Sequence, residues 1–140
     1  MTCSTKLLLM AITVLTLWLQ ISQAYCVYNR LDGADSYFYV KEREVNPRAS
    51  FKKQINNGER ECCPWNNGEC NLTGKQEGIV DFHITIGMYG ASLEGADTFF
   101  AFCSAGGGLV ITGNNLYNIT ATCNHADGKV NTRPIFAIEK

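Results

Sequence analysis

The chain contains only two histidines, His83 and His125, and imidazole is the side chain best suited to general acid–base catalysis near neutral pH. His83 follows Asp81 by two residues in an alternating apolar–polar segment, so a carboxylate on the same strand face could orient its ring. A His83/His125 acid–base pair would support ribonuclease-like hydrolysis. The alternative is that His83 faces solvent beside a surface carboxylate, while His125 lies in an exposed turn. The alternative needs no special arrangement, and we predict no catalytic residue.

Aromatic residues give a second set of candidates, for binding rather than catalysis. Trp65 is flanked by amides in a cysteine-rich loop, and Tyr37 and Tyr39 share one face of a predicted strand. Exposed aromatic rings stack on sugars and contribute strongly to protein interfaces. We therefore predict Trp65, Tyr37 and Tyr39 as binding residues for an extracellular protein or carbohydrate. Two alternatives remain open: Trp65 packs against the adjacent disulfide, and the tyrosines fill the core.

Cysteines determine the physical class of the protein. An even number of cysteines in a short exported chain predicts a disulfide framework, and six follow position 24: Cys26, Cys62, Cys63, Cys70, Cys103 and Cys123. The adjacent pair needs separate partners, so we expect one to bond Cys70 and the other Cys26, leaving Cys103 to bond Cys123. Fifteen pairings are open to six cysteines, and the sequence does not choose among them. The paired spacing typical of zinc ligands is absent, so we expect no metal.

An export signal is predicted at residues 1–24. A basic Lys6 precedes an apolar run of about 13 residues at 7–19, which is too short to span a bilayer. Ser22-Gln23-Ala24 fits the small-x-small cleavage pattern, leaving one mature domain over residues 25–140, secreted and without a membrane anchor. Two glycosylation sequons, at Asn71 and Asn118, agree with export.

Charge excludes one large class of partners. Without Lys6, the mature chain has 11 basic and 13 acidic residues, a net charge of −2, and no basic stripe. Proteins that bind DNA or RNA usually carry a basic excess, so we expect no nucleic-acid partner. The glycine run at 106–108 is not followed by the Lys-Ser/Thr of a phosphate-binding loop, and we expect no cofactor.

The hydrophobic pattern predicts an all-β fold, a single antiparallel β-sandwich or barrel of about seven to nine short, disulfide-stabilised strands. Residues 79–89 alternate most clearly and should form the central strand, and residues 98–103 are so apolar that we expect burial on both faces. Residues 51–55 fit either a strand or one helical turn. The other predicted strands are 25–31, 37–44, 109–112, 116–123 and about 135–138, the last being an edge strand after Pro134.

Short motifs along the mature chain resemble a layout found in small secreted cysteine-rich proteins of fungi. They are Tyr25-Cys26-Val27-Tyr28-Asn29, Cys62-Cys63-x-Trp65-x-Asn67-x₂-Cys70-Asn71, Asp81-Phe82-His83-Ile84 and Cys103-Ser104-Ala105-Gly106-Gly107. The resemblance implies a secreted β-rich, effector-like protein of unassigned activity and supplies no catalytic residues. We predict a secreted non-enzymatic binding or effector-like protein acting at a cell surface or cell wall. The alternatives are a small secreted hydrolase and a structural or antimicrobial cell-wall protein.

Overall fold

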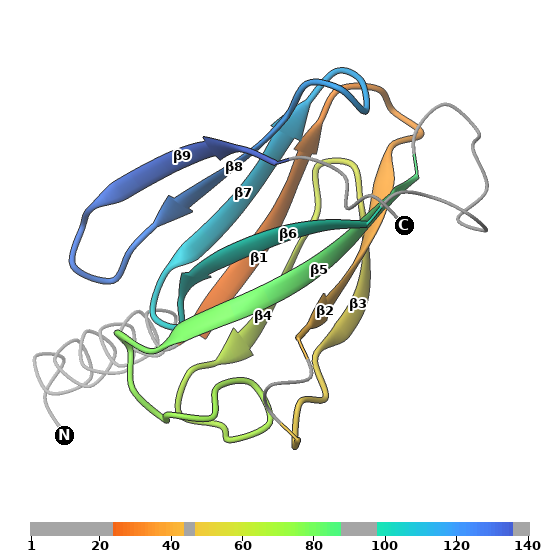
Figure 1. The fold of residues 1–140 in the computed structure, drawn as a ribbon. Coiled ribbons are helices and arrows are strands. Elements are labelled where there is room, and N and C mark those ends of the chain that lie inside the picture. Colours follow the sequence, from red (N-terminus) through yellow and green to blue (C-terminus); the bar gives the residue numbers. More distant parts are fainter. Residues whose placement is uncertain (1–23, 44–46, 88–97, 136–140) are drawn as a thin grey trace, which may run out of the picture.

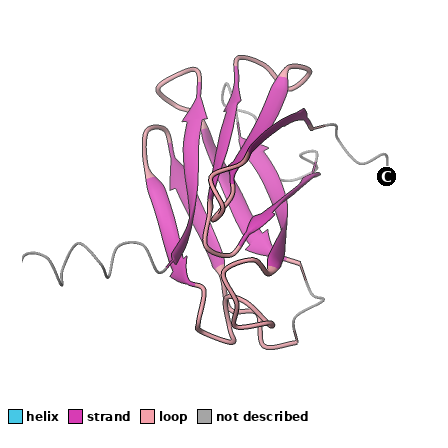
Figure 2. Ribbon diagram, turned by 90° about the vertical axis from the view of Figure 1, so that its left-hand side faces the viewer, coloured by secondary structure: helices cyan, strands magenta, loops and turns pink. Residues whose placement is uncertain are grey.

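The computed structural model describes residues 24–43, 47–87 and 98–135, and within these ranges it contains nine strands in two facing sheets and no helix (Figures 1 and 2). The five-stranded sheet has the order β4 (Arg60–Pro64), β1 (Ala24–Leu31), β7 (Gly108–Gly113), β8 (Ile119–Asn124) and β9 (Val130–Pro134). The four-stranded sheet has the order β3 (Lys52–Asn56), β2 (Tyr37–Glu42), β5 (Ile79–Gly87) and β6 (Thr98–Ser104). The predicted all-β, sandwich-like class is confirmed.

Alternating apolar residues build the core between the sheets. In β5 the residues Val80, Phe82, Ile84 and Ile86 are buried, which confirms the predicted inward face of this strand. Strand β5 has neighbours on both sides, β2 and β6, so it is central to its sheet as expected. Side chains on one face of a strand recur every second residue, and the five-stranded sheet covers the apolar face of β5.

Most strand boundaries agree with the sequence pattern, and three elements differ. Residues 60–64 form β4, which the sequence suggested was loop, because they pair with β1. Strand β1 pairs in parallel with β7, so the five-stranded sheet is not purely antiparallel. Residues 130–134 form a strand, β9, that the sequence pattern did not predict. The segment predicted at residues 51–55 contributes to a strand, β3 (Lys52–Asn56), and not to a helical turn.

The strand predicted at residues 116–123 begins later than expected, and Tyr117 lies outside it. The strand begins at Ile119, and Tyr117 is 97% exposed in the preceding turn. The turn is built by asparagines: Asn115 Oδ1 accepts a hydrogen bond from the Tyr117 backbone N–H at 2.9 Å. This local side-chain bond competes with the sheet ladder and delays the start of the strand by about three residues from the expected position.

The prediction that residues 98–103 are buried on both faces is wrong. In β6 the residues Phe99, Ala101, Cys103 and Ser104 are buried, whereas Phe100 is 45% exposed and Phe102 is 40% exposed. A sandwich has two layers, so each sheet has one face against the other sheet and one face toward solvent. Strand β6 is also an edge strand, and nothing among the described residues covers its outer face completely.

Three disulfides have the pairing expected from the sequence. Cys26 bonds Cys62 between neighbouring strands β1 and β4, and Cys63 bonds Cys70 within the cysteine-rich loop. The third bond joins Cys103 of β6 to Cys123 of β8 and so connects the two sheets. A cross-link of this kind contributes ~2–4 kcal/mol to stability in small domains.

Several predictions fall outside the described residues. Residues 1–23 of the predicted export signal lie outside the described residues, and its last residue, Ala24, begins β1. Met88 and Tyr89, the expected end of the central strand, and residues 136–138 of the expected last strand also lie outside the description. Among the described residues, no helix is long and apolar enough to cross a membrane.

Candidate functional site on the four-stranded sheet

The outward face of the four-stranded sheet collects aromatic and basic side chains in cross-strand rows. One row contains Lys52, Lys41, His83 and Phe100, which are direct register partners across β3, β2, β5 and β6. The next row contains Gln54, Tyr39, Thr85 and Thr98. Directly opposed side chains lie about 4.5–5.5 Å apart at Cβ, so four distant segments of the sequence meet here.

Contacts between these side chains involve the ring of Phe100. The His83 ring meets it edge to face, with 4.6 Å between ring centroids and an interplanar angle of 69°. The Arg43 guanidinium carbon lies 5.6 Å from the centroid of the same ring, a cation–π distance. We call Tyr39, Lys41, Arg43, Lys52, His83 and Phe100 the aromatic–basic face.

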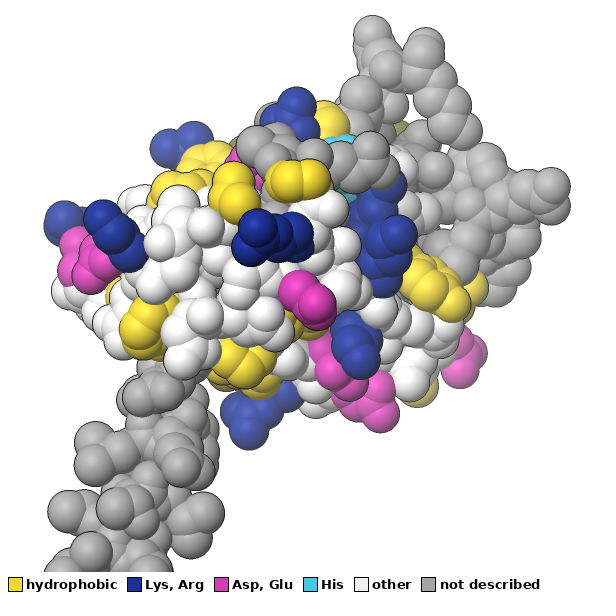
Figure 3. Space-filling model, turned by 90° about the horizontal axis from the view of Figure 1, so that it is seen from below, with side chains coloured by type: hydrophobic (Ala, Val, Ile, Leu, Met, Phe, Trp, Pro, Cys, Tyr) yellow, Lys and Arg dark blue, Asp and Glu magenta, His cyan; other side chains and the backbone are white. Residues whose placement is uncertain are grey.

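Charge on this face differs in sign from the net charge of residues 25–140. Among the described residues, three cations lie on it, Lys41, Arg43 and Lys52, and Asp81 contributes a carboxylate on the same face of β5. Figure 3 shows lysine and arginine side chains gathered beside a histidine on one side of the molecule. Folding therefore concentrates positive charge that the overall composition hides, and a local positive potential attracts anionic ligands.

A hollow of about 410 Å³ opens on this face, and its lining includes Tyr39, Lys41, Lys52, His83, Thr85 and Thr98. Tyr39 is 45% exposed at its rim. The Thr85 and Thr98 hydroxyls lie 3.3 Å apart on its floor. Aromatic rings beside hydroxyls and cations can stack on the apolar face of a flat ligand and bind its anionic groups.

Tyr37 and Tyr39, predicted together, have different roles. Tyr37 is half-buried because its ring lies over Gly87, its register partner on β5. A Cβ atom at Gly87 would lie 2.5 Å from the Tyr37 ring, so only glycine fits beneath it. Tyr37 thus packs against its own sheet, and Tyr39 is the tyrosine whose ring is open to solvent.

Trp65 lies away from the aromatic–basic face. It is half-buried and packs against the hydrophobic core together with Cys63, which agrees with the structural alternative for this residue. The Trp65 carbonyl accepts a hydrogen bond from Asn71 Nδ2 at 3.0 Å, and the Lys75 carbonyl accepts another from the same amide at 2.8 Å. These bonds fix the loop that positions Trp65 against the core.

The two sequons differ in exposure. Asn71 is 1% exposed, and its amide nitrogen donates the two bonds just described. Asn118 is exposed in the turn before β8. A glycan on the folded protein therefore fits at Asn118 and not at Asn71.

The structure does not bring His83 and His125 to one site. His83 lies on the outer face of β5, whereas His125 lies in the β8–β9 turn of the other sheet, with its Nε2 atom 3.0 Å from Asn131 Nδ2. Asp81 shares a strand face with His83 but is the register partner of Phe102. Within the described residues, no group of three or more histidine, cysteine and acidic side chains could hold a metal ion.

Sequence reasoning missed Lys41, Arg43, Lys52, Phe100 and Phe102 as candidate binding residues. The alternation of β2 placed Lys41 on the face of Tyr39, which was a usable signal. The strand order β3-β2-β5-β6, which brings the four segments together, has no local signal in the sequence. No known family model, curated protein or solved structure matches the chain.

Proposed function

We propose that the chain is a secreted, non-enzymatic binding protein whose aromatic–basic face binds an acidic polysaccharide at a cell surface or cell wall. The observation that carries this proposal is the cross-strand row Lys52–Lys41–His83–Phe100, with Tyr39 in the adjacent row. The predicted export signal and the three disulfides support an extracellular location.

An acidic polysaccharide fits the chemistry of this face in two ways. Sugar rings present C–H groups that stack on aromatic rings such as Tyr39 and Phe100. The carboxylates of a polyuronate repeat along the chain and can meet Lys41 and Lys52, which are neighbours in one row. A neutral glucan would use only the aromatic contacts and should bind more weakly.

Binding is favoured over hydrolysis by the arrangement of the histidines. Acid–base hydrolysis needs two proton-transfer groups that converge on one substrate. His83 lines the hollow, while its proposed partner His125 lies on the other sheet. His83 contacts the Phe100 ring, and in the proposed function it contributes to the contact surface.

The test is a titration of the mature protein with polygalacturonate, with laminarin as a neutral glucan, followed by calorimetry at two salt concentrations. We expect Tyr39→Ala to weaken polygalacturonate binding roughly tenfold, as an interface aromatic does. The matched control is Tyr117→Ala, which removes a tyrosine that is 97% exposed in the turn before β8 of the other sheet. It should bind like the wild type.

The charge contribution needs its own pair of variants. Lys41→Ala/Lys52→Ala should weaken binding and flatten its salt dependence, because exposed charge attraction is screened by salt. The control Lys53→Ala/Lys129→Ala removes the same charge from residues that form ion pairs elsewhere, with Glu61 and Asp127. If both double variants lose the same affinity for polygalacturonate, the effect comes from net charge alone, which would contradict a defined site.

The result that overturns the proposal is the absence of any difference between polygalacturonate and laminarin. Binding of a secreted or cell-surface protein that is lost in Tyr39→Ala, with no polysaccharide binding, would assign the same face to a protein partner. Cleavage of polygalacturonate or RNA by the wild type that disappears in His83→Ala would instead identify an enzyme.

A further inference from the structure

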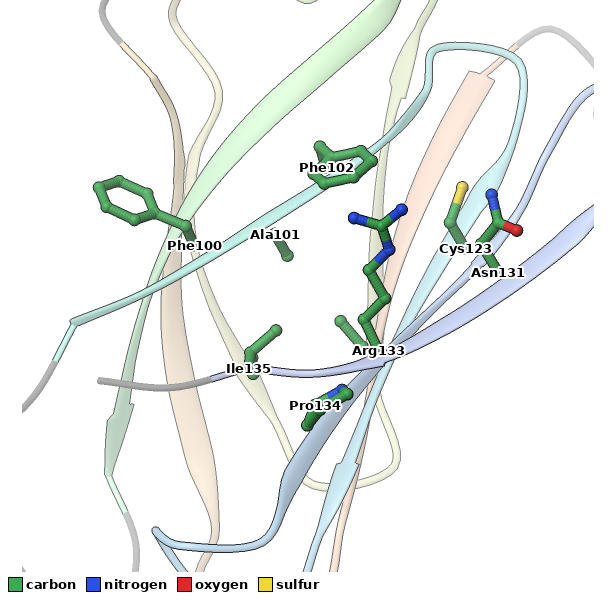
Figure 4. A pocket seen from close by; sticks show the side chains of 9 residues that line it. Phe100, Ala101, Phe102, Cys123, Asn131, Arg133, Pro134 and Ile135 are labelled. Carbon is green, nitrogen blue, oxygen red and sulfur yellow. The ribbon is translucent and has the colours of Figure 1, made fainter. Parts of the chain in front are cut away.

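A second site lies at the open edge of the sandwich, where the two sheets diverge. Strands β6 and β9 are edge strands of different sheets. All five residues of β9 are exposed, although Arg133 is the register partner of the inward-facing Ala121. The inner side of β9 therefore extends past β6 and leaves a cavity of about 280 Å³ between the two strands (Figure 4).

Small side chains create this space. Ala101 of β6 and Ala121 of β8 line the cavity, whereas the core beside them is filled by large residues such as Phe82 and Phe99. The end of the cavity is closed by Ile135, whose backbone N–H donates to the Ile119 carbonyl at 2.9 Å. Figure 4 shows Ala101 and Ile135 pointing into the space between β6 and β9.

One cation stands at the mouth of this apolar cavity. The Arg133 side chain reaches from β9 toward β6, and its guanidinium carbon lies 5.2 Å from the centroid of the Phe102 ring (Figure 4). Among the described residues, no carboxylate forms an ion pair with Arg133. A guanidinium held in place by an aromatic ring presents N–H donors suited to a carboxylate or phosphate.

We propose that this cavity binds an anionic amphiphile, a molecule with an aliphatic tail and one carboxylate. The tail would lie against Ala101, Ala121 and Ile135, and the carboxylate would accept hydrogen bonds from Arg133. At ~30 Å³ for a group the size of a water molecule, the cavity holds roughly nine methylene-sized groups. Phe100 borders both this cavity and the aromatic–basic face. The residues that would hold the ligand, Ala121 and Arg133, do not belong to that face, so the proposal does not depend on the polysaccharide function.

The experiment titrates the full mature chain with decanoate, followed by calorimetry and by NMR shifts of the Ala101 and Ala121 methyl groups. We expect a Kd on the order of 10–100 μM for a ligand of this size. Decanol and decyltrimethylammonium have comparable tails without the negative charge, so both should bind at least tenfold more weakly.

Three variants locate the site. Arg133→Gln should weaken decanoate binding roughly tenfold, and as an exposed substitution it should leave the fold intact. Arg60→Gln is its matched control, because Arg60 also lies over an aromatic ring, 5.8 Å from Tyr28, on another surface. Ala121→Leu should fill the cavity and abolish decanoate binding. If the leucine variant does not fold, Ala121→Val is tested in its place. All should bind polygalacturonate like the wild type.

Several results would overturn the proposal. Decanoate and decanol binding with equal affinity, or Arg133→Gln and Arg60→Gln behaving alike, would remove the role of Arg133. Shifts confined to residues outside the cavity would move the site elsewhere. Binding that appears only after deletion of residues 136–140 would mean that the cavity belongs to the chain's own C-terminal segment.

Discussion

Two sets of aromatic rings lie on opposite sides of the four-stranded sheet, and their neighbours differ. The inner rings, Tyr25, Phe51 and Phe82, are buried and meet one another edge to face at centroid distances of 5.2 to 6.3 Å. The outer rings belong to Tyr39, Phe100 and Phe102.

The outer set contacts cations and a histidine instead of other aromatic rings. Arg43 and His83 contact Phe100, and Arg133 contacts Phe102. Ring–ring packing serves the core, whereas a ring flanked by cations keeps part of its surface open to a ligand. The contacts of an aromatic residue thus indicate its role better than its residue type does.

Truncating one ring from each set tests whether the inner rings stabilise the fold and the outer rings bind a ligand. Phe82→Ala should lower the free energy of unfolding by ~3–5 kcal/mol, because it leaves a cavity in a packed core. Phe100→Ala should cost less than ~1 kcal/mol, since its ring is 45% exposed, but should weaken polygalacturonate binding. Urea denaturation and calorimetry measure the two effects. Equal losses of stability would mean that the outer ring is also structural.

The disulfide between the sheets should have the next largest effect. Cys103→Ala/Cys123→Ala removes a bond that closes a separation of 20 residues and should cost ~3 kcal/mol. Because Cys103 lies on β6, the loss should also disturb Phe100 and weaken polygalacturonate binding. Cys63→Ala/Cys70→Ala, with a separation of seven residues, should cost less and leave binding unchanged. Unchanged binding in the first variant would show that strand pairing alone positions β6.

How much of this could be predicted depends on whether a signal is local. Alternation along β5 and β2 correctly placed Val80 and Phe82 inside and Tyr39 outside. Strand β6 has no such contrast, since Phe99, Phe100, Ala101 and Phe102 are all apolar. The exposure of its outer face follows from its position at the edge of the sheet, which the sequence of β6 alone does not indicate.

The candidate site was less predictable than the fold. Tyr39 and His83 were identified separately, for binding and for catalysis, and the structure places them in one hollow. Their partners Lys52 and Phe100 come from strands far away in the sequence, and strand order is set by long-range pairing that no single segment encodes. The parallel β1–β7 pair was missed for the same reason.

Trp65 is half-buried, so its exposure lies between those of the inner and outer rings. Substitution of Asn71, which holds its loop, tests whether Trp65 serves the core or the binding surface. Asn71→Ala should cost ~1–3 kcal/mol, because the partly buried hydrogen bonds to the Trp65 and Lys75 carbonyls are both lost. Trp65 is the only tryptophan of residues 25–140, so its fluorescence should shift to longer wavelength as the loop loosens. Polygalacturonate binding should not change. A loss of binding without a loss of stability would return Trp65 to the binding surface.

The smallest expected effect concerns Tyr25, whose hydroxyl is buried in the inner set. Burial raises the pKa of Tyr25 strongly, and the nearby charge of Glu42 raises it further. In the unfolded chain a tyrosine ionises near pH ~10, so the folded state holds this proton more tightly. The contribution to stability is complete below pH ~10 and is lost as the pH rises above that value, because only the unfolded chain then ionises readily.

Tyr25→Phe should therefore flatten the decline in stability above pH ~10 while leaving stability near pH 7 within ~1 kcal/mol of the wild type. Urea denaturation at pH 7, 9, 10 and 11 measures the slope. Tyr117→Phe removes a hydroxyl from a residue that is 97% exposed and should keep the wild-type slope, so it controls for the loss of one tyrosine. If both variants show the same slope of stability against pH, burial does not hinder the ionisation of Tyr25. The difference between buried inner rings and exposed outer rings would then not apply to this residue.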